Sequence, residues 1–399
     1  MNSHRFSLNG LSYLPIRWGL MPLLMAVWAG GACLGVAEEI SPKVLWKQDE
    51  NGYHTYRIPS LIRTKQGTLL AFCEARKKSA SDTGKIDLVM RRSEDGGKSW
   101  SDQQVVWEDE GNTCGNPCPV IDEETGAIWL LLTHNLGHDN EGAIKAKTAE
   151  GTRTVWVCHS DDDGKTWTDP MEITSTTKNQ DWGWYATGPG VGIQIKNGPH
   201  KGRLVIPCDH SYDIDKSENS AGYEFGSHVI FSDDHGKTWQ LGGTIRPKMN
   251  ECQVIEVGDS GELLIDMRSY RGQGCRAQAR SADGGLTWTE PEDNRQLVAP
   301  VCQASIIRFA EPGKGKRPTL LFSSPGSPSK RVDLTLRVSH DDGKDWSQSI
   351  RLYTGPTAYS CLEVLPDGSV ACLAEIGERS PYQTISLLTI PARKIQPPE

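Results

Sequence analysis

The sequence lacks an excess of basic residues. Its 399 residues include 43 Lys and Arg against 51 Asp and Glu, which gives a net charge of −8 at pH 7. A protein that binds nucleic acid through phosphates needs a basic face, so this balance argues against a nucleic-acid partner. An anionic small ligand stays open, because a few local arginines can bind one carboxylate within an acidic protein.

Long apolar runs are also scarce, and the sole candidate lies near the N-terminus. Two arginines precede the apolar run 18–28, and the small residues 35–37 follow it. This order predicts a cleaved export signal at 1–37 and a secreted or periplasmic protein of residues 38–399 with no membrane span. A retained anchor is one alternative, although the run is shorter than the ~20 residues of a typical span. A lipoprotein attached through Cys33 is the other.

Closely spaced, metal-binding cysteines are missing as well. Of the 11 cysteines only Cys114 and Cys118 lie close together, and no second pair or His-x-x-x-His follows them. This spacing does not support a zinc site, and we expect no metal ion and no organic cofactor. Cys73 and Cys158 lie in strand-like runs, where small buried thiols are the simpler interpretation. An exported protein could still pair some of its cysteines.

Long helical periodicity is absent after the apolar run, and a repeat takes its place. The pattern Ser-x-Asp-x-Gly-x-x-Trp occurs five times, beginning at Ser93, Ser160, Ser232, Ser281 and Ser339. Asp accepts hydrogen bonds from nearby backbone N–H groups, and Gly adopts turn conformations that strain other residues, so each copy predicts a tight turn. Short strand-like runs precede the copies, and strands with regular turns predict an all-β fold.

The five copies resemble the Asp-box (bacterial neuraminidase) repeats of the exo-α-sialidase, or neuraminidase, family. The resemblance implies a six-bladed β-propeller of the sialidase type, formed by residues 38–399 as a single domain. Five boxes in six blades imply that one blade lacks a box and is shared by the two chain ends. In that family the boxes lie away from the active site, so they indicate the fold and not the chemistry.

Three arginines match the set that binds the substrate carboxylate in this family. Arg57 lies in a Tyr-Arg-Ile-Pro motif near the start of the predicted domain, and Arg268 and Arg331 each follow a strand-like run. A guanidinium group suits this role, because it is always charged and can bind a carboxylate through two parallel hydrogen bonds. Any one of these arginines could form a surface ion pair, but three in the family's order favour the binding role.

The resemblance assigns the acid/base role to Asp82, in a polar loop before the strand-like run 86–90. A loop position lets the carboxyl group close over the leaving group of the substrate. We expect an enclosed site to raise the pKa of Asp82, so that it can donate a proton near neutrality. Asp87 is the alternative, but it lies within the alternating strand pattern and is interpreted as structural.

Glu251 and Tyr359 match the pair that attacks the sugar in this family. Sialic acid carries a carboxylate on its anomeric carbon, so a neutral tyrosine, deprotonated by a neighbouring glutamate, avoids the repulsion that a carboxylate nucleophile would meet. Glu251 begins a strand-like run, whereas Glu256 lies in its middle and is the weaker candidate. A buried tyrosine that only forms hydrogen bonds is the alternative for Tyr359. Glu375 matches the carboxylate that orients Arg57.

Three further residues are expected to contact the sugar. Glu74 and Arg76 resemble residues that line the hydroxyl side of the sugar in related enzymes. Tyr185 lies in an aromatic segment, 181–190, which suits a rim for the N-acyl or glycerol groups, although a structural aromatic turn fits that segment equally well. His134 has no partner motif and receives no role.

Together these residues predict a monomeric, retaining exo-α-sialidase that acts on sialylated glycans: glycoproteins, glycolipids or oligosaccharides. A sugar-binding propeller without catalysis is one alternative, but it would have no reason to keep Asp82, Glu251 and Tyr359 together. A two-carboxylate glycosidase is another, and it would leave three arginines and Tyr359 unexplained. A trans-sialidase would use the same covalent intermediate, and water exclusion by the loops would decide between transfer and hydrolysis.

Overall fold

Nearly every element of the protein is a β-strand. The computed structural model describes residue 14 and residues 40–310 and 318–396. The predicted export signal, residues 1–37, therefore lies outside the described residues apart from Leu14. Within the described part, the prediction of an all-β fold is confirmed, and the helices are short: α1 (Glu141–Lys145), α2 (Thr174–Thr177) and the 3-10 turn η1 (Ala392–Lys394). None of them is long and apolar enough to cross a membrane.

The strands pair in sets that follow the chain, and all pairs are antiparallel except a short parallel contact between β4 and β6. The first half contains β1 (Lys43–Lys47), β2 (Thr55–Arg63), β3 (Leu69–Arg76), β4 (Ile86–Ser93), β5 (Gln104–Trp107), β6 (Thr113–Ile121), β7 (Ile128–Asn135), β8 (Thr154–Ser160), β9 (Met171–Glu172), β10 (Trp182–Thr187), β11 (Ile193–Gln194), β12 (Leu204–Asp213), β13 (Tyr223–Ser232) and β14 (Gln240–Ile245). The second half contains β15 (Met249–Val257), β16 (Glu262–Ser269), β17 (Cys275–Ser281), β18 (Glu292–Val298), β19 (Ser305–Ala310), β20 (Thr319–Pro325), β21 (Val332–Ser339), β22 (Gln348–Val364), β23 (Val370–Ile376) and β24 (Thr384–Ile390).

Four hydrogen-bonded sheets contain these strands. One sheet runs β2-β3-β4-β6-β7-β8-β9, with β5 on β4, and a second runs β10-β12-β13-β14, with β11 on β12. The third is β15-β16-β17-β18, and the fourth is β1-β24-β23-β22-β21-β20-β19. In the fourth sheet β1 pairs antiparallel with β24, so the first and last of the described strands share one sheet.

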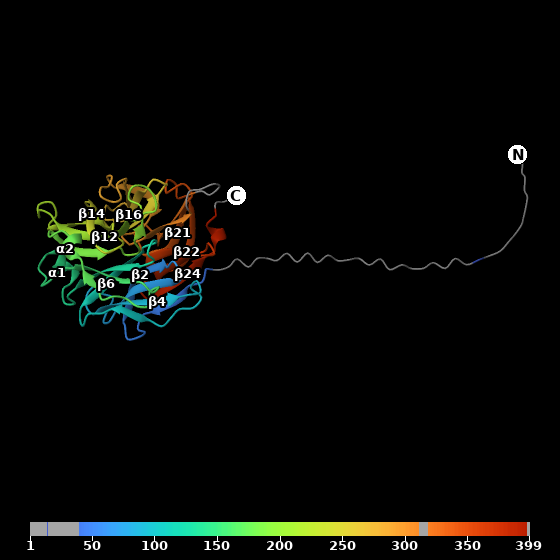
Figure 1. Ribbon diagram of the computed structural model, residues 1–399, viewed down its shortest axis with the longest axis horizontal. Coiled ribbons are helices and arrows are strands. Elements are labelled where there is room, and N and C mark those ends of the chain that lie inside the picture. Colours follow the sequence, from blue (N-terminus) through green and yellow to red (C-terminus); the bar gives the residue numbers. More distant parts are fainter. Residues whose placement is uncertain (1–13, 15–39, 311–317, 397–399) are drawn as a thin grey trace, which may run out of the picture. The chain divides into compact units, whose positions relative to one another are not determined.

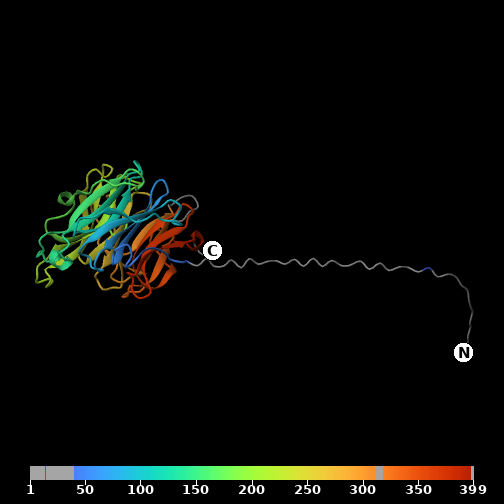
Figure 2. The same ribbon diagram turned by 90° about the horizontal axis from the view of Figure 1, so that it is seen from below.

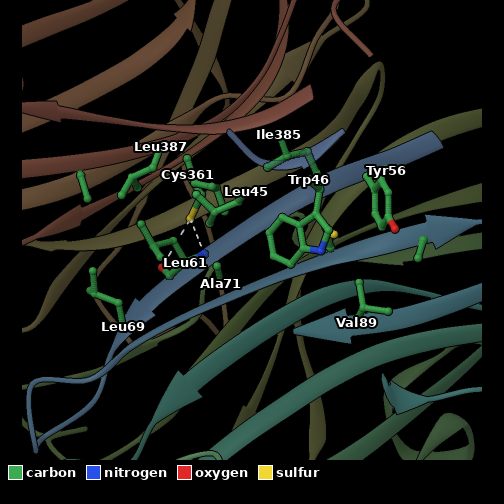
Figure 3. Close-up of a cluster of buried hydrophobic side chains, with 14 of the residues drawn as sticks. Leu45, Trp46, Tyr56, Leu61, Leu69, Ala71, Val89, Cys361, Ile385 and Leu387 are labelled. Atoms are coloured by element: carbon green, nitrogen blue, oxygen red, sulfur yellow. Dashed lines mark hydrogen bonds between the residues drawn. The ribbon is translucent and has the colours of Figure 1, made fainter. Parts of the chain in front are cut away.

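Strands from the two ends of the sequence also pack against each other. In Figure 1 the blue strand β2 lies beside the red strands β22 and β24, and Figure 2 shows the blue and red strands together from a second side. The backbone N–H of Leu61 in β2 donates to the Sγ atom of Cys361 in β22 at 3.3 Å. Figure 3 shows this contact within a buried cluster that also contains Trp46 of β1 and Ile385 of β24.

The five Ser-x-Asp-x-Gly-x-x-Trp segments form turns with one shared hydrogen-bond pattern. In the second segment the Ser160 Oγ accepts from the Gly164 N–H at 2.9 Å, and the Asp162 Oδ1 accepts from the Thr166 N–H at 2.9 Å. The same serine-to-glycine contact recurs in the other four segments. The register of β3 and β4 pairs Leu69 with Ser93, and Arg76 with Ile86. The first turn and Arg76 therefore lie at opposite ends of this strand pair.

All ten cysteines from Cys73 to Cys372 are buried and unpaired. Cys73 and Cys158 lie in strands, as the sequence pattern predicted. The thiols pack among apolar side chains, and burial raises the pKa of Cys158 and Cys361 to about 12. These cysteines are therefore neutral, small core residues.

Candidate active site

A cavity of about 300 Å³ opens where one end of strands β2, β6, β15 and β22 meets several loops. Eight of the ten residues predicted to form the site line it: Arg57, Glu74, Arg76, Asp82, Glu251, Arg268, Arg331 and Tyr359. Glu375 lies directly behind this lining, and Tyr185 lies elsewhere. The cavity therefore gathers residues that are up to about three hundred positions apart in the sequence.

Irregular strand pairing turns several of these side chains into the cavity. The register shifts lie between Arg57 and Ser60 in β2, Gly115 and Cys118 in β6, Met249 and Cys252 in β15, and Thr357 and Ser360 in β22. A β-bulge leaves an extra residue unpaired and re-aims the side chains around it. The four intervals contain Ile58, Asn116, Glu251 and Tyr359, each of which lines the cavity.

Tyr359 and Glu251 are in direct contact. The Tyr359 hydroxyl donates to the Glu251 Oε1 at 2.5 Å, and the Arg268 Nη1 donates to both side chains, at 3.2 Å to Tyr359 Oη and 2.7 Å to Glu251 Oε2. Burial, followed by the charge of Glu251, raises the pKa of Tyr359 well above its ordinary value despite three nearby arginines. The phenol is therefore neutral at rest, and Glu251 is placed to accept its proton.

Glu375 holds Arg57 in place. Its Oε1 and Oε2 accept from the Arg57 Nε at 3.1 Å and from Nη2 at 3.3 Å, and Glu375 itself is fully buried. The same carboxylate accepts the backbone N–H groups of Ile58 at 2.9 Å and Tyr359 at 3.1 Å. Ile58 has a φ of 61°, a conformation that β-branched residues rarely adopt. Glu375 thus fixes an arginine, a strained bulge and the tyrosine together.

The other two arginines are each held by a tyrosine that the sequence analysis did not select. The Arg268 Nη2 donates to the Tyr270 hydroxyl at 2.9 Å, and the Arg331 Nη1 donates to the Tyr382 hydroxyl at 2.8 Å. The Tyr382 ring also lies 4.3 Å from the Arg57 guanidinium carbon, within cation–π range. Tyr270 could have been found from strand alternation, because it lies two residues after Arg268. No sequence signal marks Tyr382.

Asp82 lies in the loop between β3 and β4, with a half-exposed side chain (49%). Its Oδ1 is 2.8 Å from the Arg76 Nη2 and 3.4 Å from the Arg57 Nη1. Burial favours the neutral form, but the charges of Arg76 and Arg57 outweigh it, and the pKa of Asp82 lies below its ordinary value. The expectation of a raised pKa is therefore wrong for this geometry, because two arginines face this carboxyl group.

Glu74 and Arg76 form a buried ion pair on the same wall. The Arg76 Nε and Nη2 donate to the Glu74 Oε2 at 2.9 and 2.6 Å, and the Glu74 Oε1 accepts the Asn116 N–H at 2.9 Å. Arg76 also donates to the Ala80 carbonyl oxygen at 2.5 Å. These contacts fix the loop that carries Asp82.

The structure does not place Tyr185 in the cavity. Its side chain is fully buried in an apolar cluster, and its hydroxyl donates to the Thr177 carbonyl oxygen at 3.3 Å. Alternation along β10 instead directs the neighbours Trp184 and Ala186 to the cavity. The aromatic segment thus reaches the cavity through Trp184 and Ala186, and Tyr185 does not line it.

The two rejected carboxylates have structural partners. Asp87 is buried and accepts from the Tyr53 hydroxyl at 2.6 Å. Glu256 accepts the backbone N–H groups of Lys196 and Asn197 at 2.7 and 3.0 Å. Glu256 lines a second cavity of about 430 Å³. This cavity lies at the opposite ends of β2, β6, β15 and β22, and its walls are largely aliphatic. That cavity contains none of the ten predicted site residues.

The chemistry of the first cavity follows from these contacts. Five arginines line it, and three of them, Arg57, Arg268 and Arg331, are the set predicted to bind a carboxylate. Arg57 and Arg268 each have one carboxylate partner within 3.2 Å. Arg331 donates to the Tyr382 hydroxyl and the Val301 carbonyl oxygen, and no ion pair forms on it within the described residues. Such a wall favours an anionic ligand group, next to a tyrosine with its own base.

Known proteins match most of the length of this chain. A family described as a BNR repeat-like domain matches residues 67–372. A sialidase from Micromonospora viridifaciens is 33% identical over 347 residues, which cover 84% of this chain and 52% of that protein. Sialidase-3 from Mus musculus is 32% identical over 402 residues, which cover 87% of this chain and 94% of that protein. The chain thus spans about half the length of the first relative and nearly all of the second.

Solved structures match as well. The Hadza microbial sialidase Hz136 has a TM-score of 0.74 and 32% identity, over 86% of this chain and 67% of that one. The intramolecular trans-sialidase from Ruminococcus gnavus has a TM-score of 0.73 over 90% of this chain and 99% of that one. Its identity is 20%, so this second match concerns the fold alone.

Proposed function

The chain belongs to the sialidase family, and we propose that it is an exo-α-sialidase that hydrolyses terminal α-linked sialic acid from glycoproteins, glycolipids or oligosaccharides. The observation that carries the proposal is the 2.5 Å contact between the Tyr359 hydroxyl and Glu251, in a cavity that Arg57, Arg268 and Arg331 also line. A tyrosine with an adjacent base suits attack on an anomeric carbon that carries a carboxylate, because the nucleophile itself is uncharged.

We propose that the strands form a six-bladed β-propeller. Six antiparallel sets follow one another along the described chain, and the last of them combines part of β22 with β23, β24 and β1. Contacts between neighbouring inner strands support a ring: β2 packs against β6 and β22, β15 packs against β12 and β19, and β19 packs against β22. The cavity then lies at one end of the ring's axis.

The proposed reaction has two displacements. Arg57, Arg268 and Arg331 bind the sugar's carboxylate. The Tyr359 oxygen bonds to the anomeric carbon and passes its proton to Glu251, while Asp82 protonates the departing glycosidic oxygen. Water, deprotonated by Asp82, then displaces Tyr359, which regains its proton from Glu251. Two inversions give net retention of the anomeric configuration.

Asp82 must be protonated for the first step, although Arg76 and Arg57 hold its pKa below the ordinary value. The substrate carboxylate would offset part of the positive charge of Arg57, which is one of the two arginines that lower this pKa. Substrate binding would therefore raise the pKa of Asp82. Its half-exposed position also leaves a path for water, which favours hydrolysis over transfer to a sugar acceptor.

Partners, oligomeric state and export are also part of what we propose. The expected partners are sialylated glycans, and we propose a monomer whose residues 1–37 are removed during export. Sequencing the N-terminus of the exported protein tests the last point, and Glu38 as the first residue is the expected result. A start at Met1 would contradict it.

The experiment is fluorophore release from a 4-methylumbelliferyl sialoside by the wild type, Tyr359→Phe and Asp82→Asn, each checked for folding by circular dichroism. We expect wild-type turnover, a near-complete loss in Tyr359→Phe and a fall of roughly 10²–10⁴-fold in Asp82→Asn. A folded wild type that binds sialic acid without turnover would contradict the enzyme and indicate a binding propeller. Release only when a sugar acceptor is added would indicate a trans-sialidase.

A further inference from the structure

Two buried polar side chains on the cavity wall each have an atom without a hydrogen-bond partner. They are Arg153, just before β8, and Asp209 in β12, and each is only 1% exposed. The Arg153 Nη1 and the Asp209 Oδ1 form no hydrogen bond. An unpaired polar group inside a protein costs folding free energy, so unpaired polar atoms on a cavity wall are suited to bind a ligand.

Arg153 is a guanidinium group without a carboxylate partner. Its Nε donates to the Thr133 Oγ1 at 3.1 Å, its Nη2 donates to the Asn116 Oδ1, and the Trp184 ring lies 3.9 Å from its central carbon. No ion pair forms on Arg153 within the described residues. These contacts fix the plane of the group and leave Nη1 as its free donor.

Asp209 has the properties of a neutral carboxylic acid. Its one hydrogen bond comes from the Asn250 Nδ2 to Oδ2, at 2.7 Å. Burial, followed by the charge of Glu251, raises the pKa of Asp209 well above its ordinary value. Because Oδ2 accepts a hydrogen bond, the proton of the neutral acid belongs on Oδ1, the atom without a partner. Asp209 therefore offers a second hydrogen-bond donor.

We propose that Arg153 and Asp209 form a specificity subsite that donates hydrogen bonds to an uncharged oxygen of the bound sugar. This inference rests on the proposed function, since it concerns the same cavity. Two donors select an acceptor, and Arg57, Arg268 and Arg331 are already assigned to the carboxylate in the proposed function. A sialic acid offers two uncharged acceptors, the carbonyl oxygen of its acylamino group and the oxygens of its hydroxyl groups. Trp184 and Ala186 supply an apolar surface beside the subsite.

The test compares Asp209→Ala and Asp209→Asn. Alanine removes the donor, so kcat/KM should fall about tenfold, the effect of one neutral hydrogen bond. Asparagine can present an N–H group at the same place while its carbonyl oxygen accepts from Asn250, so kcat/KM should stay within about threefold. Arg153→Lys removes Nη1 and should resemble Asp209→Ala. Asp122→Asn is the matched control, since Asp122 is fully buried but bonded to Thr125, Gln194 and His235, outside the cavity.

Two substrates distinguish the acceptors: 4-methylumbelliferyl glycosides of N-acetylneuraminic acid and of its 5-hydroxy analogue, which lacks the acylamino group. If the acylamino carbonyl is bound, Asp209→Ala loses activity only on the first substrate. Equal losses on both substrates indicate a hydroxyl oxygen. The proposal is overturned if folded Asp209→Ala matches the wild type on both, or if Asp209→Asn loses as much as Asp209→Ala.

The same variants separate this inference from the proposed function. If the wild type turns over neither glycoside, the proposed function fails, and the Kd values of the two free sugars, measured by calorimetry, replace kcat/KM. A tenfold weaker Kd in Asp209→Ala with an unchanged Kd in Asp209→Asn still supports the subsite. Equal Kd values in the wild type and Asp209→Ala, including no binding by either, overturn it.

Discussion

At the scale of single residues, Tyr359 has the contacts that the proposed nucleophile needs. Its hydroxyl meets both Glu251 and Arg268, and both of these line the cavity. Removing this oxygen in Tyr359→Phe should lower kcat by about a thousandfold or more, because the covalent route is lost. Steady-state kinetics measure this. Tyr53→Phe is the control, since Tyr53 is a core tyrosine bonded to Asp87, and its kcat should stay within about twofold.

Tyr382 is predicted to position two arginines. Its hydroxyl accepts from Arg331, and its ring stacks on Arg57. Tyr382→Phe removes only the first contact and should raise KM about threefold to tenfold with little change in kcat, since carboxylate binding weakens. Tyr382→Leu removes both contacts and should raise KM further. An effect on kcat alone, with KM unchanged in both variants, would contradict this role.

The residues that meet in the candidate site could largely be predicted from the sequence, whereas their surroundings could not. Tyr359, Glu251 and Asp82 lie in motifs whose order is visible along the chain. Arg153 and Asp209 become a pair only through the packing of strands that are more than fifty residues apart. The pKa of Asp82 was expected to be raised and is instead lowered. The sequence could not show this, because the position of Arg76 relative to Asp82 depends on the loop conformation.

At the scale of elements, the repeated turns should contribute stability and not activity. The Asp162 carboxylate accepts from the Lys165 and Thr166 N–H groups and from the Thr166 hydroxyl. Asp162→Ala should lower the free energy of unfolding by about 1–2 kcal/mol, the range for lost hydrogen bonds of this kind. Urea unfolding measures this change. The kcat of the folded variant should equal that of the wild type, and a fall in kcat without a fall in stability would contradict the structural role.

Two histidines in the paired strands β12 and β13 make stability depend on pH. His210 and His228 are fully buried, with their Nδ1 atoms 3.0 Å apart, and burial lowers the pKa of both well below the ordinary value. Below about pH 6.5 these histidines bind protons in the unfolded chain but stay neutral in the folded protein. The free energy of unfolding therefore falls as pH falls. Each histidine contributes roughly 1.4 kcal/mol per pH unit.

Urea unfolding between pH 7 and pH 5 measures this dependence. His228→Gln should show a smaller slope, because it has one titrating group fewer. Equal slopes in the wild type and His228→Gln would contradict the assignment to these histidines.

Local irregularities explain where the strand-level prediction failed. Strict alternation places neighbouring residues on opposite faces of a strand, and a shift of one residue exchanges the two faces. β10 carries a register shift between Trp182 and Tyr185, and its residues are buried on both faces. Hydrophobic pattern alone therefore could not choose between Trp184 and Tyr185. The turns, in contrast, were predictable because Ser, Asp and Gly form them through local hydrogen bonds.

At the scale of the whole molecule, the pairing of β1 with β24 should be essential for stability. Trp46 of β1 is 1% exposed and packs with residues of β2, β22 and β24 (Figure 3). Trp46→Ala should lower the free energy of unfolding by about 3–5 kcal/mol, as for other buried aromatic residues. Chemical denaturation measures this effect. Val44→Ala is the control, because Val44 lies in the same strand but is 52% exposed, and its effect should be small.

The succession of antiparallel strand sets along the chain was predictable from the repeated turns. The sharing of one sheet by strands from both ends of the chain was expected from the family resemblance. The bounds of β1 could not be predicted, because a five-residue strand with two buried residues shows little hydrophobic periodicity.

The most direct test of the account is to trap the covalent intermediate. A fluorinated sialic acid analogue that slows the second displacement is incubated with the full chain, and peptide mass spectrometry locates the added sugar. We expect one sugar per chain on the peptide that contains Tyr359, and none in Tyr359→Phe. A sugar found on Glu251 or Asp82 would contradict the tyrosine nucleophile.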